Sequence, residues 1–71
     1  MRARLPGHVF ADEIVVGLRI VPPGRVRAVE VLYQLSDPGR AGYFEFACRS
    51  RSGYCALRLH RSEQVRVGGP R

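Results

Sequence analysis

The segment Tyr43–His60, YFEFACRSRSGYCALRLH, decides the fold that the sequence predicts. Two β-prone runs of alternating apolar and polar residues flank a turn at Ser50–Gly53. Gly53 can supply the positive φ with which such a loop ends. A hairpin centred on this turn pairs Cys48 with Cys55, and every pair out to the two ends of the segment is chemically compatible. The segment therefore predicts a β-hairpin with a defined register.

Side chains alternate between the two faces of a strand, so the predicted register separates the hairpin residues into two groups. One face is apolar and is expected in the core: Phe44, Phe46, Cys48, Cys55, Leu57 and Leu59. The opposite face is polar and mostly basic, with aromatic rings among the cations: Tyr43, Glu45, Arg49, Tyr54, Arg58 and His60. This second face is the main functional indication in the sequence.

Composition is that of one small folded domain of 71 residues, and the charge is strongly basic. The chain carries 12 arginines, no lysine and six acidic residues, which gives a net charge of +6. A GC-rich genome produces such an arginine bias by codon usage alone. A polyanionic ligand would select it as well, because guanidinium groups match phosphate and stack on bases. The sequence leaves both explanations open.

The N-terminal segment Met1–Gly7 is basic and lacks the apolar core of a signal peptide. No apolar run approaches the roughly 18 residues of a membrane span. With only two cysteines and no export signal, we expect a cytoplasmic protein. Residues 1–7 are expected to form a flexible basic arm, residues 8–67 a single domain, and residues 68–71 a flexible tail.

Two further strands are predicted before the hairpin. The run Glu13–Val21 is β-branched and apolar, Pro22–Gly24 has the sequence of a type II turn, and Arg25–Leu35 is a second β-prone run. Pairing around the turn would bring apolar residues together on one face. The expected pairs are Ile14 with Tyr33, Val16 with Val31, and Leu18 with Val29.

After the hairpin, Arg61–Gln64 is predicted to form one helical turn capped by Ser62, and Val65–Val67 a short last strand. Five short antiparallel strands must curl to bury one face. This order resembles the SH3-like small barrel over residues 9–67, in architecture only, and such barrels host many functions. The expected fold is thus an all-β SH3-like barrel. The alternatives are an OB-type barrel, or an α+β fold if Arg25–Gln34 is helical.

The basic hairpin face suggests contact with nucleic acid, because single-strand binders combine cations with aromatic rings on which bases stack. The predicted site comprises Tyr43, Arg49, Arg51, Tyr54, Arg58 and His60 on the hairpin, together with Arg25 and Arg27. Arg2 and Arg4 on the arm would reach along phosphates. The alternative is an ordinary solvated sheet face, on which Glu45 and Arg58 form a cross-strand pair.

No catalytic or metal site is predicted. The Cys48 and Cys55 spacing is not that of a zinc knuckle, and His60 lies on the opposite face, so we expect two reduced core thiols and no cofactor. No carboxylate, histidine or serine stands in a motif for acid–base or nucleophilic catalysis.

These observations predict a small, basic, non-catalytic protein that binds DNA or RNA, or is associated with nucleic acid, through the hairpin face. The alternative is a protein–protein interaction module, an adaptor or inhibitor, that docks on an acidic partner as a homodimer, because small barrels have open edges. A third hypothesis is an enzyme whose cleft is shared within an oligomer. No membrane partner is expected.

Overall fold

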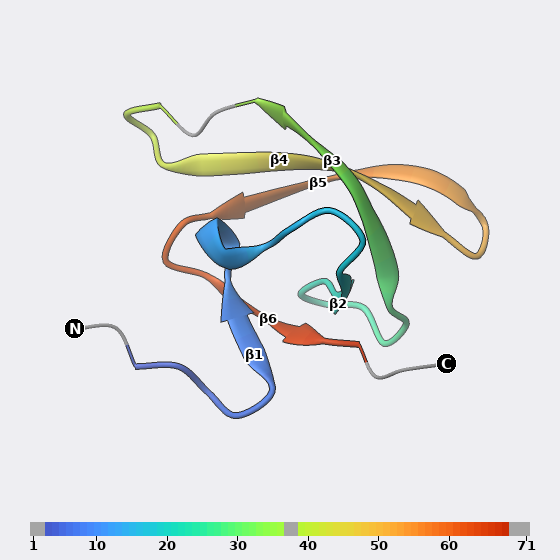
Figure 1. Ribbon diagram of the computed structural model, residues 1–71, viewed down its shortest axis with the longest axis horizontal. Coiled ribbons are helices and arrows are strands. Elements are labelled where there is room, and N and C mark those ends of the chain that lie inside the picture. The colour runs from blue at the N-terminus through green and yellow to red at the C-terminus, as the bar shows by residue number, and fades with distance from the viewer. Residues whose placement is uncertain (1–2, 37–38, 69–71) are drawn as a thin grey trace.

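The computed structural model describes residues 3–36 and 39–68, which form one antiparallel sheet in the order β1-β6-β2-β3-β4-β5 (Figure 1). In chain order the elements are β1 (His8–Phe10), the 3₁₀ helix η1 (Ala11–Glu13), β2 (Arg19–Val21), β3 (Val29–Ser36), β4 (Tyr43–Ser50), β5 (Gly53–His60) and β6 (Gln64–Val67). The all-β prediction is confirmed, and the α+β alternative is wrong because most of the segment concerned is strand β3. Within these two ranges, no helix is long and apolar enough to cross a membrane.

The β4–β5 hairpin has the register that the sequence predicts. Ser50 lies opposite Gly53 at the turn, and Tyr43 lies opposite His60 at the far end. Gly53 adopts a φ of 131°, and the Ser50 hydroxyl donates a hydrogen bond to its carbonyl oxygen at 2.9 Å. The apolar face of the hairpin packs inward, with Phe46 at 2% exposure. Because a slip by one residue would turn this face to solvent, burial itself fixes the register.

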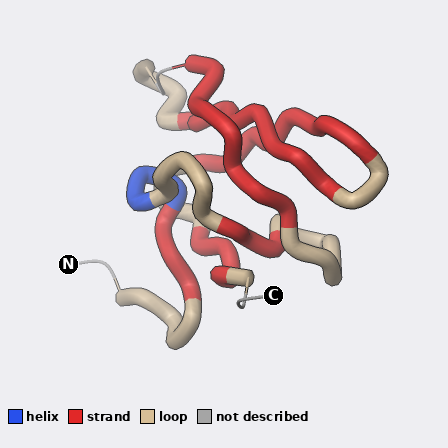
Figure 2. The backbone as a smooth tube through the Cα atoms, turned by 45° about the vertical axis from the view of Figure 1, so that its right-hand side comes forward, coloured by secondary structure: helices blue, strands red, loops and turns tan. Residues whose placement is uncertain are grey.

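Strand β3 belongs to both halves of the sheet. Its first two residues pair with β2, and residues 30–36 pair with β4. The β3–β4 ladder is interrupted by register shifts between Val31 and Tyr33 and between Gln34 and Ser36. Bulges of this kind bend a strand and increase its local twist. Figures 1 and 2 show the result, a curved β3 that leads from the β1–β6–β2 half to the β4–β5 half.

The core lies between the two halves of the curled sheet. Its buried side chains come from η1 and the segment after it and from β2 to β6: Ala11, Ile14, Ile20, Val29, Val31, Phe46, Cys48, Leu59 and Val65. In the described ranges no polar or charged residue is buried among them. Burial of apolar surface is therefore the term that holds the two halves together.

The sheet has six strands rather than the predicted five, and it is open. Strand β1, which pairs with β6, was not predicted, because its three residues are too few to show alternation. Strands β1 and β5 are the two edges of the sheet. The structure therefore gives a single open, curled antiparallel sheet.

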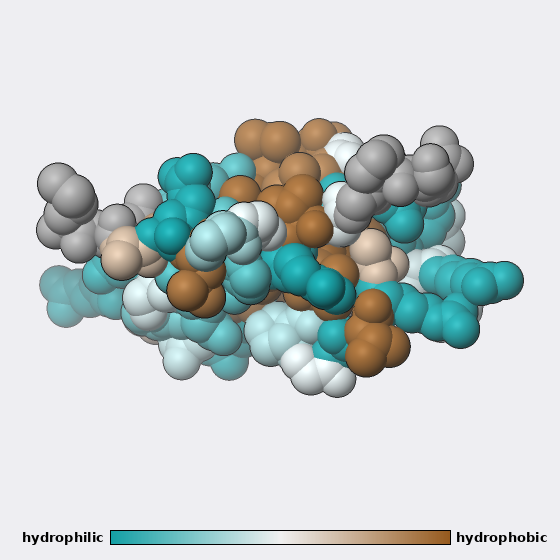
Figure 3. Space-filling model, turned by 90° about the horizontal axis from the view of Figure 1, so that it is seen from below, coloured by the Kyte–Doolittle hydropathy of each residue, from teal (hydrophilic) through white to brown (hydrophobic). Residues whose placement is uncertain are grey.

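The prediction of a strand over Glu13–Val21 is wrong for most of its length. Only Arg19–Val21 is strand, because η1 and a loop occupy the rest. In that loop Val15 and Val16 are exposed, at 64% and 69%. Seen from below Figure 1, the surface has an apolar area with hydrophilic residues on both sides (Figure 3). The β-branched composition of this segment therefore marks exposed apolar surface rather than a buried strand.

The predicted type II turn is present, but the strand register around it is not the expected one. Arg25 N donates to Pro22 O at 3.1 Å, and Gly24 has a φ of 78°. The chain then continues as a loop to Val29, so that Ile20 rather than Leu18 lies opposite Val29. The four loop residues shift the predicted pairing of β2 with β3 by two positions. Because the shift is even, each paired residue keeps its predicted face of the sheet but has a different partner.

The predicted helical turn before the last strand is also wrong. His60–Glu63 is a β-turn in which Glu63 N donates to His60 O at 2.9 Å and His60 N donates to Glu63 Oε1 at 2.6 Å. Ser62 is therefore not a helix cap. Its hydroxyl lies 2.6 Å from His60 Nδ1 instead. The helical element of the described residues is η1, near the start of the domain.

The described part of the predicted basic arm is bonded to the rest of the molecule. The Gln64 side chain accepts a hydrogen bond from Leu5 N at 2.7 Å and donates one to Ala3 O at 2.9 Å. Arg4 forms an ion pair with Glu13. The first two residues of the predicted arm and the last three of the predicted tail lie outside the described residues.

Removal of the Phe46 ring tests the position of the core. We expect Phe46→Ala to lower the free energy of unfolding by about 3–5 kcal/mol, because it leaves a cavity. Phe46→Leu, which keeps most of the volume, should lose about 1–1.5 kcal/mol and covers the case in which the alanine variant does not fold. Tyr54→Ala, on the outer face, should change the value by less than about 0.5 kcal/mol. Urea unfolding followed by circular dichroism measures all three, and equal losses for Phe46→Ala and Tyr54→Ala would contradict the assignment of faces.

Candidate nucleic-acid interface

A row of four side chains crosses the outer face of the sheet near the hairpin tip. The strand register places Arg19 of β2 opposite Glu30 of β3, and Glu30 opposite Arg49 of β4. Arg49 in turn lies opposite Tyr54 of β5. Directly opposed residues share a face, with Cβ atoms about 4.5–5.5 Å apart. The row therefore presents cation, carboxylate, cation and aromatic ring on four adjacent strands.

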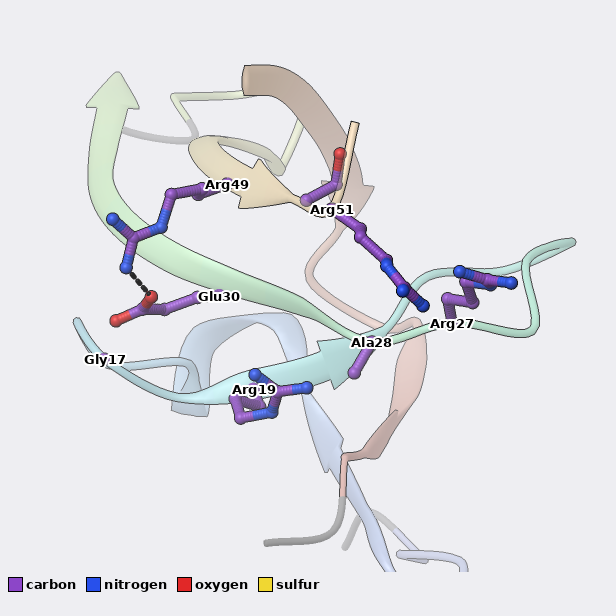
Figure 4. A pocket seen from close by; sticks show the side chains of 8 residues that line it. Gly17, Arg19, Arg27, Ala28, Glu30, Arg49 and Arg51 are labelled. Carbon is purple, nitrogen blue, oxygen red and sulfur yellow. Dashed lines mark hydrogen bonds and ion pairs between the residues drawn. The ribbon is translucent and has the colours of Figure 1, made fainter. Parts of the chain in front are cut away.

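The middle of this row is an ion pair. Arg49 Nη2 donates to Glu30 Oε1 at 2.6 Å, and the two side chains are 56% and 34% exposed (Figure 4). An exposed pair of this kind contributes only about 0–1 kcal/mol to stability. At the end of the row the Nε of Arg19 is buried and has no hydrogen-bond partner. The row thus holds one arginine that is paired with a carboxylate, Arg49, and one whose Nε makes no hydrogen bond, Arg19.

Beside the row lies a cavity of about 760 Å³. Its lining residues are Gly17, Arg19, Arg27, Ala28, Glu30, Arg49, Ser50 and Arg51. The arginines come from β2, from the loop between β2 and β3, from β4 and from the hairpin turn (Figure 4). Four guanidinium groups and one carboxylate share the cavity, so its lining carries an excess of positive charge.

A second cavity of about 510 Å³ adjoins the first and shares four lining residues with it: Arg27, Ala28, Ser50 and Arg51. Its other lining residues are Gly24, Arg25, Val26, Val29 and Ser52. Arg25, which the sequence placed in the site, lines this second cavity and not the first. Val26 at its rim is 86% exposed, which gives the hollow an apolar side.

The far end of the hairpin holds a separate cluster. The Arg58 guanidinium carbon lies 4.3 Å from the centre of the Tyr43 ring, and the Tyr43 and His60 rings meet edge to face with centroids 5.1 Å apart. Tyr43 is consequently only 38% exposed. At about 3.3 Å per residue, Arg58 lies roughly 13 Å along the hairpin from Arg49, and Tyr43 lies roughly 20 Å from it. The predicted basic face is therefore divided into two clusters.

The sequence interpretation missed Tyr33, which was expected opposite Ile14 on the same face as Val29 and Val31. The register places Tyr33 opposite Ala47 on the outer face, and its side chain is 55% exposed. All three tyrosines of the chain are thus exposed. The signal that could have found Tyr33 is the pair of small residues Ala47 and Ala56, which face each other on the outer side and leave room for a larger neighbour.

The structure therefore distributes the predicted residues unevenly. Arg27, Arg49 and Arg51 line the first cavity, Arg25 lines the second, and Tyr54 ends the row beside Arg49. Tyr43, Arg58 and His60 lie at the far end of the hairpin. Arg19 and Tyr33 are added to the face by the structure. Arg4 is paired with Glu13, and Arg2 lies outside the described residues.

Cys48 and Cys55 lie opposite each other as predicted, and both thiols are free. Burial raises the pKa of the Cys48 thiol from 9.0 to about 11, and the neighbouring Cys55 adds to this shift. Among the described residues, no group of three or more histidine, cysteine, aspartate or glutamate side chains gathers in a way that could hold a metal ion.

No protein-family model, curated protein or solved structure matches this chain.

The shifted pKa of Cys48 predicts a loss of stability in alkaline solution. Between pH 9.0 and about 11 the unfolded chain releases the thiol proton while the folded chain keeps it, so ionisation favours unfolding. The contribution is fully present below pH 9.0 and is lost as the pH rises through about 11. Unfolding by urea across this range should show a shallower decline for Cys48→Ala than for the wild type. Parallel declines would show that the thiol is not shielded.

Proposed function

We propose that this protein binds single-stranded nucleic acid on the outer face of its sheet and catalyses no reaction there. The observation that carries the proposal is the row Arg19–Glu30–Arg49–Tyr54, which ends in a tyrosine 79% exposed beside an arginine-lined cavity. Bases would stack on the exposed rings, and guanidinium groups would neutralise phosphates.

A single strand fits this surface better than a duplex does. Bases that are paired and stacked in a helix cannot offer a ring face to tyrosine, whereas unpaired bases can. Tyr33 and Tyr54 lie on β3 and β5, two strand spacings or about 10 Å apart across the sheet. Beside them lie the small side chains of Ala47 and Ala56, which project little from the sheet. Both rings are therefore accessible to bases of one strand.

The wider setting is part of the same proposal. The curled sheet would be an SH3-like barrel left open between β1 and β5, which is supported by β3 serving both halves and by the short β6 beside β1. A cytoplasmic location is supported by the low cysteine content. The net charge of +6 would speed encounter with any polyanion.

A second candidate function is a protein–protein interaction module that docks on an acidic partner as a homodimer. The observation that favours it is the edge strand β5, which pairs only with β4 and carries Arg58 beside the half-buried Leu57. Edge strands are ready templates for pairing with a second chain. This candidate would be favoured if the free protein sediments as a dimer and captures an acidic protein in place of oligonucleotides.

Two substitutions in the row test the proposed function. With a fluorescent single-stranded oligonucleotide, we expect Tyr54→Ala to weaken binding by about 1–3 kcal/mol, or roughly 5- to 150-fold. Arg49→Gln should weaken binding. It should also reduce the slope of the logarithm of the binding constant against the logarithm of salt concentration, by somewhat less than one unit. Arg40→Gln removes the same charge from the exposed loop before β4 and serves as the matched control. Anisotropy titrations in which all three variants bind like the wild type, or in which duplex binds as well as single strand, would contradict the proposal.

The two clusters predict a dependence on oligonucleotide length. Because Arg58 and Arg49 are roughly 13 Å apart along the hairpin, a strand of about 2 nucleotides should reach only one cluster, while one of about 12 nucleotides should reach both. Arg58→Gln should therefore weaken binding of the long probe and leave the short probe unchanged. Equal effects on both probes would place Arg58 in the same contact as Arg49.

A further inference from the structure

The cavity beside the row is lined by more positive than negative side chains. Four guanidinium groups line a volume of about 760 Å³, and only Glu30 opposes them. Cavities of about 300–1,000 Å³ are typical of small-molecule sites. The arrangement therefore fits an anion with more than one charge.

The donors of this cavity are only partly used by the protein. Arg49 is bonded to Glu30, but the buried Nε of Arg19 has no hydrogen-bond partner. A buried donor without a partner is uncommon in native proteins, because it forfeits about 1–3 kcal/mol. Because this atom is shielded from solvent, an anion in the cavity would have to reach Arg19 through its Nη atoms. Arg27 and Arg51 project from the loop and the turn on the other side of the same hollow (Figure 4).

The position of the cavity links it to the aromatic end of the row. Arg49 lines the cavity and also lies directly opposite Tyr54, whose ring is 79% exposed. Opposed residues have Cβ atoms about 4.5–5.5 Å apart. A nucleotide could therefore place its base on Tyr54 while its own phosphate enters the cavity.

We infer that the cavity binds the terminal phosphate monoester of a nucleic-acid strand, with the terminal base stacked on Tyr54. This inference rests on the proposed function. A terminal phosphate carries about −1.5 to −2 charges and three free acceptor oxygens, which suits a cavity lined by several arginines. An internal phosphodiester carries one charge and would leave most of these donors unused. The same chemistry is present at a 5′ or a 3′ end.

The test compares one single-stranded oligonucleotide of about 8 nucleotides, a length within the usual site size, in three forms: 5′-phosphate, 3′-phosphate and hydroxyl at both ends. We expect one phosphorylated form to bind at least about 10-fold more tightly than the hydroxyl form, since each 1.4 kcal/mol is tenfold in affinity. Arg51→Gln should remove this preference without touching the sheet, and Arg19→Gln should do the same. Arg58→Gln, at the far end of the hairpin, should keep it.

Three results would overturn the inference, and they separate it from the proposed function. Equal affinity for all three forms, with Arg51→Gln weakening each alike, would leave single-strand binding standing and remove the end specificity. A preference that survives both Arg19→Gln and Arg51→Gln would place the terminal phosphate elsewhere. Binding of inorganic pyrophosphate by calorimetry, without binding of any oligonucleotide, would refute the proposed function and with it the assignment of the anion to a strand end.

Discussion

The strict alternation of apolar and polar residues along β4 and β5 is the constraint on which the rest of the structure depends. Phe46, Cys48 and Leu59 are buried only in one register, because side chains of a strand alternate with a period of two. That register also turns Arg49 and Tyr54 outward as neighbours. The packing of the core and the composition of the outer face are therefore two consequences of one pairing, and a change in one would displace the other.

The curvature of β3 completes the face. A flat β3 could not pair with β2 in one half of the sheet and with β4 along its length while both halves enclose one core. The two register shifts in the β3–β4 ladder supply the bend. As a result Glu30 stands between Arg19 and Arg49, and the β2–β3 loop approaches the hairpin turn closely enough for both to line one cavity.

Sequence reasoning succeeded where the pattern is local and failed where partners come from distant parts of the chain. The hairpin was predictable because eight residues on each side of a short turn show the same alternation. The strand over Glu13–Val21 was mispredicted because β-branched composition does not distinguish a strand from an apolar loop such as Val15–Val16. Tyr33 was placed on the wrong face because a bulge leaves no mark in the alternation of one strand. Arg19 was missed because its place in the cavity follows from the pairing of β2 with β3, which the unrecognised loop shifts by two positions.

The single carboxylate of the cavity explains how the site can be both stable without ligand and open to one. Four like charges in one hollow repel one another, and Glu30 relieves this by pairing with Arg49. Because the pair is exposed, it contributes only about 0–1 kcal/mol, so a phosphate can replace it at little cost. A carboxylate carries one negative charge and a terminal phosphate nearly two, so the phosphate would attract Arg49 more strongly than Glu30 does, against the repulsion of the carboxylate that stays in the cavity. Competition between Glu30 and ligand for Arg49 would therefore make the cavity selective for charge, while the neighbouring Tyr54 would select for an unpaired base.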